Sequence, residues 1–246
     1  MLTEQEIFIA LISFVATLIG SMGGGGSSLI ASPVFLMLGF PLPVVIGSGM
    51  VSGILWSLIA SRNYLRGHTM DWQLAGSLTG CGLIGAYFGT KAMLAFDPDV
   101  LKRVLGVVII ALVCLYHFKK SFGIGPGPVR YNKFITGLFA VPLGFYEASF
   151  GSGNGIFTSA ILTTARGFTM LEALGYYYLI ASVWCVFAAC IYISTGNYSL
   201  KLIVPAICGS VIGATIGSRL GKKYGPAFVK PIFVGVGTIL GLKLLL

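Results

Sequence analysis

The sequence predicts an all-α integral membrane protein with two inverted-topology repeats, each a glycine-broken re-entrant hairpin plus three transmembrane helices. Composition, an internal repeat and the placement of positive charge predict it. The 246 residues are 56% hydrophobic and only 9% charged, whereas soluble domains carry about 25% charged residues. A helix needs about 20 apolar residues to cross a bilayer, and several such runs follow one another here with short polar breaks. Lipid is therefore the expected solvent for most of the surface.

The internal repeat emerges when the sequence is shifted by 128 residues. Glycines then coincide more often than their abundance explains, so we interpret the halves as copies of one unit. We expect repeat 1 at residues 1–120, a connector rich in Gly, Pro and basic residues at 121–133, and repeat 2 at 134–246. The matches are Gly23 with Gly151, Gly25 with Gly153, Gly39 with Gly167, Phe40 with Phe168, Gly47 with Gly175 and, after a local one-residue slip at Gly67 and Gly196, Gly85 with Gly213, Gly89 with Gly217 and Lys91 with Arg219.

Each unit contains four apolar segments, the first of them broken by a glycine cluster. The Gly-x-x-x-Gly pairs at 85–89 and 213–217 lie in the third segment of each unit, where small residues let helices approach closely. We therefore interpret these pairs as packing features. The segments are residues 7–38, 43–60, 71–94 and 100–118 in the first unit, and 134–165, 171–194, 200–220 and 227–246 in the second.

Positive charge indicates whether the broken segments cross the membrane or turn back. The pieces 7–21 and 27–38 are shorter than the span of about 20 residues that a crossing needs. Cytoplasmic connections carry the excess of Lys and Arg. If the broken segments cross, the 16 basic residues divide equally between the two sides; if they turn back, eleven face one side. The other side then holds only Lys91, Lys102, Arg103, Lys201 and Lys243.

This asymmetry predicts two re-entrant hairpins and six full spans in a multi-pass protein of the cell (inner or plasma) membrane. Both termini are predicted to lie outside the cytoplasm. Each half crosses three times, an odd number, so the second half must be inverted relative to the first. Inverted repeats with broken helices are typical of secondary transporters, whose substrate site lies near the middle of the membrane where the repeats meet.

The two glycine breaks are the predicted substrate site. Non-helical backbone inside a membrane occurs where protein or a water-filled cavity supplies hydrogen-bond partners. Each break also begins a helix, whose free N–H groups and positive dipole end favour an anion. The alternative is that the glycines only permit tight helix crossing. The candidate binding residues are Gly23, Gly24, Gly25, Gly26, Ser27 and Ser28 in the first break, Gly151, Ser152, Gly153, Asn154 and Gly155 in the second, and Ser48 and Tyr176 in the helices that follow.

Glu147 is the one acidic residue deep within an apolar stretch, directly before the second break. An intramembrane carboxylate is costly and usually faces a cavity or a partner. Two interpretations stay open. Glu147 either exchanges a coupling proton during transport or is a protonated structural acid bonded to backbone.

Several function classes are disfavoured. The cysteines (Cys81, Cys114, Cys185, Cys190 and Cys208) lie in apolar stretches without a CxxC pattern or a nearby His, so we expect no metal or other cofactor. No Ser/His/Asp set or pair of carboxylates suggests an enzyme. The net charge of +9 is scattered over short connections, which argues against nucleic-acid binding. The expected partners are a small anion, the lipid bilayer and a coupling proton, and a glycine-rich helix face also permits a homodimer.

The order of features resembles the TauE/SafE family of membrane transporters. The shared features are the early glycine break, Pro33, Gly39-Phe-Pro, a small-residue helix and Gly67-His-Thr-Met-Asp-Trp72. The resemblance spans nearly the whole chain. It implies export or uptake of sulfur-containing anions such as sulfite, sulfoacetate or other organosulfonates. Together with the predicted inverted repeats, this suggests a secondary transporter that works by alternating access and is coupled to the proton gradient. A passive anion channel and a transporter of a different small anion are the alternatives.

Overall fold

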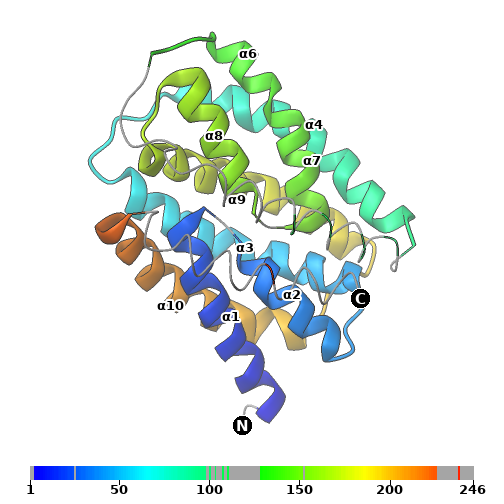
Figure 1. The fold of residues 1–246 in the computed structure, drawn as a ribbon. Helices are drawn as coiled ribbons and strands as arrows, with labels where there is room; N and C mark the ends of the chain where they lie inside the picture. Colours follow the sequence, from blue (N-terminus) through cyan, green and yellow to red (C-terminus); the bar gives the residue numbers. More distant parts are fainter. Residues whose placement is uncertain are drawn as a thin grey trace.

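The computed structural model describes residues 3–24, 26–97, 128–151 and 153–225, with single positions between 100 and 110 and at 238. Within this part every regular element is an α-helix, as expected, and the helices pack into one bundle (Figure 1). The elements are α1 (Glu4–Gly23), α2 (Ser27–Met37), α3 (Leu42–Leu65), α4 (Trp72–Ala95), α6 (Lys133–Leu138), α7 (Ala140–Phe150), α8 (Asn154–Arg166), α9 (Met170–Ser194) and α10 (Leu200–Tyr224).

The first broken segment folds as a hairpin of α1 and α2 (Figure 1). A capping box between Thr3 and Glu6 begins α1 before the apolar run does. The turn places Gly24 at φ 99° and Gly26 at φ 106°, a left-handed conformation that costs a residue with a Cβ about 1–2 kcal/mol. The first limb therefore differs from the predicted piece 7–21: it has 20 residues and is long enough to cross a membrane.

The second broken segment folds in the same way, with α6 and α7 as one limb and α8 as the other. Its turn holds Gly151 at φ 67° and Gly153 at φ 80°. The limb is interrupted at Phe139, whereas the sequence predicts one continuous piece. Pro142 explains the interruption, because a proline has no N–H to donate to the carbonyl four residues earlier, at Leu138.

The long helices repeat at the spacing seen in the sequence. α3 and α9 begin at residues 42 and 170, and α4 and α10 begin at 72 and 200, so both pairs are 128 residues apart. The packing partners are exchanged between the halves: α1 lies along α10, α4 lies along α6 and α7, and α3 lies against α9. Each hairpin is therefore held by the fourth helix of the other half.

Close glycine contacts hold each hairpin limb, as predicted for the Gly-x-x-x-Gly pairs. A Cβ at Gly85 would collide with the Val141 carbonyl of α7, and one at Gly213 would lie within 2.5 Å of the Phe14 carbonyl of α1. Gly89 and Gly217 make equivalent contacts one turn later. Backbones that approach this closely leave no room for a side chain, so these crossings require glycine.

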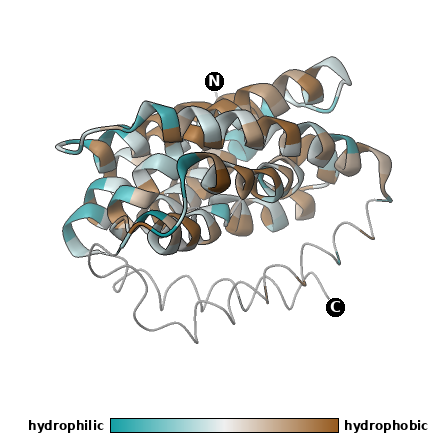
Figure 2. Ribbon diagram, turned by 90° about the horizontal axis from the view of Figure 1, so that it is seen from above, coloured by the Kyte–Doolittle hydropathy of each residue, from teal (hydrophilic) through white to brown (hydrophobic). Residues whose placement is uncertain are grey.

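Four described helices, α1, α3, α9 and α10, are long and apolar enough to cross a membrane. Large apolar side chains such as Phe88, Val186 and Ile212 are exposed along the helices, and hydrophilic residues lie mainly in loops and near helix ends (Figure 2). The helices agree with the predicted segments 43–60, 71–94, 171–194 and 200–220 to within a few residues. Predicted segments 100–118 and 227–246 fall, apart from single positions, outside the described residues.

Candidate functional site

The tips of the two hairpins lie directly against each other. The Ser28 hydroxyl of α2 donates to the Gly151 carbonyl at 2.8 Å. A Cβ at Gly155 would collide with the carbonyl of Gly24. The glycine breaks thus meet, as sequence analysis expects of facing loops, but backbone fills the space at the point of contact. Space for a ligand is therefore found beside the contact between the two tips, not between them.

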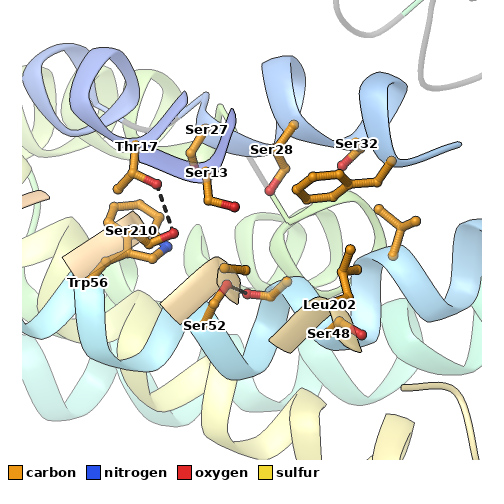
Figure 3. A pocket seen from close by; sticks show the side chains of 15 residues that line it. Ser13, Thr17, Ser27, Ser28, Ser32, Ser48, Ser52, Trp56, Leu202 and Ser210 are labelled. Carbon is orange, nitrogen blue, oxygen red and sulfur yellow. Dashed lines mark hydrogen bonds between the residues drawn. The ribbon is translucent and has the colours of Figure 1, made fainter. Parts of the chain in front are cut away.

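A cavity of about 30 Å³ lies beside the tips, between the α1–α2 hairpin, α3 and α10 (Figure 3). This volume is space for about two water molecules. Eight of its lining side chains carry a hydroxyl group and none carries a charge. The lining residues are Ser13, Thr17, Ser27, Ser28, Ala31, Ser32, Phe35, Val45, Ser48, Gly49, Ser52, Trp56, Leu202, Ala206 and Ser210.

The hydroxyls of the cavity differ in how they are satisfied. Thr17 donates to Ser210 at 3.1 Å, and Ser52 donates to the Gly49 carbonyl of its own helix at 3.1 Å. Ser13 is only 3% exposed, and its hydroxyl has no hydrogen-bond partner. A buried hydroxyl without a partner costs about 1–3 kcal/mol. Ser13 therefore offers a donor that a guest can satisfy (Figure 3).

The N-terminus of α2 adds backbone donors at the same place. Ser27 and Ser28 are the first two residues of the helix, and both line the cavity. The preceding residue, Gly26, provides no side-chain cap for the first-turn N–H groups. An uncapped helix N-terminus carries partial positive charge and is a site where proteins bind anions.

The structure brings together only part of the predicted site. Ser27, Ser28 and Ser48 line the cavity, Gly23 ends α1, and Gly24 and Gly26 lie in the turn beside the cavity. Gly151, Gly153, Asn154 and Gly155 form the other tip, which contacts the first tip but does not line the cavity. Gly25 and Ser152 lie outside the described residues.

Tyr176 lies apart from the cavity. Its hydroxyl accepts a hydrogen bond at 2.6 Å from the backbone N–H of Asp71, which caps α4. Its ring lies 4.9 Å from that of Phe168. Tyr176 is therefore a buried contact between α9 and the start of α4.

Sequence analysis missed several lining residues: Ser13, Thr17, Ser32, Ser52, Trp56 and Ser210. A signal for most of them is present in the sequence. Hydroxyl residues recur four positions apart in three apolar helices, at 13 and 17, 28 and 32, and 48 and 52. Residues at this spacing share one helix face, so each pair forms a polar stripe that glycine counting does not detect.

Glu147 is 4% exposed and lies near the end of α7, outside the cavity wall. Its carboxylate accepts a hydrogen bond from Tyr177 at 3.2 Å, and the Asn154 side chain lies within hydrogen-bonding reach. The Asn154 amide donates to the Leu143 carbonyl, and its side-chain oxygen has no partner.

The described residues contain no group of three or more His, Cys, Asp or Glu side chains placed to hold a metal ion. Four cysteines are free thiols, and Cys114 falls outside the described residues. The polar groups that line the cavity are hydroxyls, the indole N–H of Trp56 and backbone amides. Such groups bind by hydrogen bonding.

Comparison with known proteins identifies the family. Residues 9–244 match the family model described as sulfite exporter TauE/SafE. A probable membrane transporter protein, ORF9, from Sinorhizobium sp. is 30% identical over 97% of this chain and 91% of its own length. A probable membrane transporter protein from Haemophilus influenzae is 25% identical over 91% and 88%, and YjnA from Bacillus subtilis, with the same description, is 23% identical over 94% and 96%.

No solved structure gives a significant match to the chain. The family assignment therefore depends on sequence, and the match extends over both hairpins and all the long helices. The all-helical fold with exposed apolar faces agrees with a membrane protein. The chain belongs to the TauE/SafE sulfite exporter family of membrane transporters.

Proposed function

We propose that the protein is a secondary transporter that moves a small sulfur-containing anion across the cell membrane by alternating access. Sulfite is the first candidate, and sulfoacetate or another organosulfonate the next. The observation that carries the proposal is the cavity, where eight hydroxyls and the start of α2 surround a small space without any carboxylate. Hydroxyl and amide donors bind oxyanion oxygens, and no negative side chain repels the guest.

The chemistry of the cavity suits a transporter. A hydrogen bond to a charged group contributes about 1.5–3 kcal/mol, so several neutral donors hold an anion without the strong attraction of a buried arginine. The anion can then be released when the hydroxyl and amide donors move apart from one another. Because the cavity is small, it favours a compact oxyanion, and a longer organosulfonate requires the hairpin to move outward.

Two features support an inverted arrangement of the halves, with both termini outside the cytoplasm. The starts of α3 and α9, and of α4 and α10, are 128 residues apart, and each hairpin packs on the fourth helix of the other half. If the hairpins return to the side from which they enter, the basic residues divide eleven to five instead of eight to eight, and such an excess on one side is typical of membrane proteins. In this arrangement the two hairpin tips meet at the centre.

Glu147 supports proton coupling as part of the same proposal. It lies next to the second hairpin tip, and Asn154 connects it to the start of α8. A proton on Glu147 removes the negative charge and so weakens the hydrogen bond that the carboxylate accepts from Tyr177 and its interaction with the Asn154 side chain. Protonation thus changes contacts at the tip that touches Ser28, a residue of the cavity wall.

Counterflow in proteoliposomes tests this function. Vesicles containing the purified protein are loaded with unlabelled sulfite, and entry of labelled sulfite is followed after dilution. A transporter gives transient accumulation of label that saturates with sulfite concentration. A passive anion channel gives no counterflow, and a panel of other small anions identifies a different substrate. If none of these anions exchanges, the proposal is wrong.

A further inference from the structure

The repeat predicts a counterpart of the cavity between the second hairpin, α9 and α4, and large side chains fill the part of it that α9 and α4 border. Seven of the lining positions, shifted by 128 residues, fall on side chains that are each at most 1% exposed and pack in the hydrophobic core. On the hairpin itself the counterpart of Thr17 is Phe145, which is 40% exposed. Ser48 corresponds to Tyr176, and Ser52 to Ile180. The counterparts with described burial of this kind are Leu74, Leu78, Ala173, Tyr176, Tyr177, Ile180 and Trp184.

The cavity and its filled counterpart belong to opposite ends of the bundle. We call the end where α3 and α10 begin the first end, and the end where α4 and α9 begin the second end. Ser61, near the end of α3, donates to the Gly175 carbonyl near the start of α9 at 3.0 Å, so α3 and α9 run antiparallel. The 24 residues of α3 place the two ends about 36 Å apart.

Each end carries the same hydrogen bond between the halves. At the first end the N–H of Ser199, before α10, donates to the Ser48 hydroxyl at 3.0 Å. At the second end the N–H of Asp71, before α4, donates to the Tyr176 hydroxyl at 2.6 Å. Both donors and both acceptors are 128 residues apart. The bond is thus a shared element of the fold that joins the third helix of one half to the fourth helix of the other.

At the second end an ion pair among the described residues reinforces this bond. The two carboxylate oxygens of Asp71 lie 2.9 and 2.8 Å from Lys133 Nζ, at the start of α6. Lys133 also donates to Gln73 at 2.9 Å, and Asp71 caps α4 through the N–H of Leu74. The counterparts of Asp71 and Lys133 at the first end are Ser199 and Gln5, which carry no charge.

The open ends of the second hairpin are also tied together there. Arg166, the last residue of α8, donates to the Tyr131 carbonyl at 2.9 Å. The backbone N–H of Arg130 donates to the Ala165 carbonyl at 2.9 Å. Through Lys133, Asp71 therefore fixes the entry of this hairpin against both α4 and α9.

We propose that Asp71 is a positioning residue for transport: with Lys133 and Tyr176 it forms a latch that holds the second end shut while the cavity is accessible from the first. The latch must break before the second half can open its own cavity. This inference builds on the proposed alternating-access function and concerns which end is open. It assigns no substrate contact to Asp71.

Cysteine accessibility tests the latch without any substrate. In a chain whose five native cysteines are replaced by alanine and that stays folded by size-exclusion chromatography, Leu74→Cys reports on the second end and Ser52→Cys on the cavity. Lys133→Gln removes the ion pair. We expect an impermeant maleimide to label Cys at position 74 about two- to fivefold faster, the range that a partly exposed ion pair supports, and to label Cys at position 52 more slowly.

Two control variants separate a latch from general destabilisation. Lys133→Arg keeps the ion pair and should label at the parent rates. Lys201→Gln removes an exposed charge from the first turn of α10, at the first end, and should change neither rate. Unchanged labelling in Lys133→Gln, or faster labelling at both positions together, would overturn the latch. A labelling shift without sulfite counterflow would instead refute the proposed substrate and leave the latch intact.

Discussion

The two halves of the chain have the same arrangement of helices, but the space between the helices is a cavity at one set of equivalent positions and is filled by large side chains at the other. In the first half Trp56 borders the hydroxyl-lined cavity. Its counterpart Trp184 is fully buried over Gly82 and donates to the Thr79 carbonyl at 3.1 Å. The comparison shows that the backbone arrangement alone does not create a binding site. Serine in place of tyrosine and isoleucine leaves the first half hollow, and the larger side chains close the second.

Two tyrosines at equivalent positions make the same kind of hydrogen bond in both halves, in contrast to the cavity. Tyr64 donates to the Ser21 carbonyl at 2.8 Å, and its counterpart Tyr192 donates to the Ala148 carbonyl at 2.9 Å. Both satisfy carbonyl groups at the end of the first hairpin limb, which a helix leaves without internal partners. These hydrogen bonds support both hairpins, whereas the cavity belongs to one.

The largest expected effect tests what the halves share. Gly85→Leu places a side chain against the Val141 carbonyl, where the backbone of α7 cannot move without separating the helices. We expect more than about 3 kcal/mol of destabilisation, above the usual cost of overpacking, and little folded protein by size-exclusion chromatography. Gly80→Leu on the same helix is the control, because nothing lies within 4 Å of a Cβ there. Equal yields of the two variants would contradict the close crossing.

The next prediction makes the first half resemble the second. Ser52→Ile introduces the side chain found at the counterpart, Ile180, and fills the cavity. We expect sulfite counterflow to fall at least about tenfold, equivalent to about 1.4 kcal/mol of lost binding or transition-state stabilisation, while the melting temperature changes little. Thr195→Ile, at an exposed position after α9, adds the same bulk outside the cavity and should transport normally. A wild-type rate in Ser52→Ile would exclude this cavity from the pathway.

Glu147→Gln tests whether the second hairpin tip, unlike the first, contains a group that exchanges the coupling proton. Glutamine keeps an acceptor for Tyr177 but cannot exchange a proton. We expect sulfite exchange to continue and its acceleration by a proton gradient to disappear, measured in vesicles with and without an imposed gradient. Glu172→Gln, in the first turn of α9, is the matched control. Full proton dependence in Glu147→Gln would leave Glu147 a structural acid.

The smallest effect concerns pH and the Asp71 ion pair. The hydrogen bond from Lys133 lowers the pKa of Asp71 below its ordinary value of 3.8. A lowered pKa means that the pair stabilises the protein above about pH 4 and that this stabilisation disappears as pH falls through the folded-state pKa. Because both side chains are partly exposed, we expect at most about 0.5 kcal/mol. The melting temperatures of wild type and Lys133→Gln should differ slightly at neutral pH and converge in acid; a difference that grows in acid would reverse the assigned sign.

Apolar runs and glycine breaks predicted much of the fold, because both are local properties of the sequence. The helices near 43–60, 71–94, 171–194 and 200–220 were visible as apolar runs, and the glycine turns at 24–26 and 151–153 as breaks. The break at Phe139 was missed because Pro142 lies inside an apolar run. The length of α1 was missed because polar residues, Thr3 and Glu6, begin the helix.

The site was harder to predict because it depends on contacts between distant segments. Ser27, Ser28 and Ser48 were found through the glycine break and the repeat. Ser13 and Ser210 could not be joined from sequence, because α1 and α10 meet only when the halves exchange packing partners. Tyr176 occupies the position equivalent to Ser48, but its larger side chain fills the space there and contacts the backbone N–H of Asp71.

Sulfite binding to purified wild-type protein and to Ser13→Ala, followed through the rise in melting temperature with ligand concentration, tests the hydroxyl cavity most directly. A ligand that binds only the folded state raises stability by an amount that grows with the logarithm of the ratio of ligand concentration to Kd. We expect a rise in the wild-type melting temperature that continues with the logarithm of sulfite concentration, an affinity about ten- to a hundredfold lower in Ser13→Ala, and a wild-type affinity in Ser194→Ala, whose hydroxyl lies at the exposed end of α9. Equal sulfite affinity in all three proteins, or no rise in any of them, would contradict this expectation.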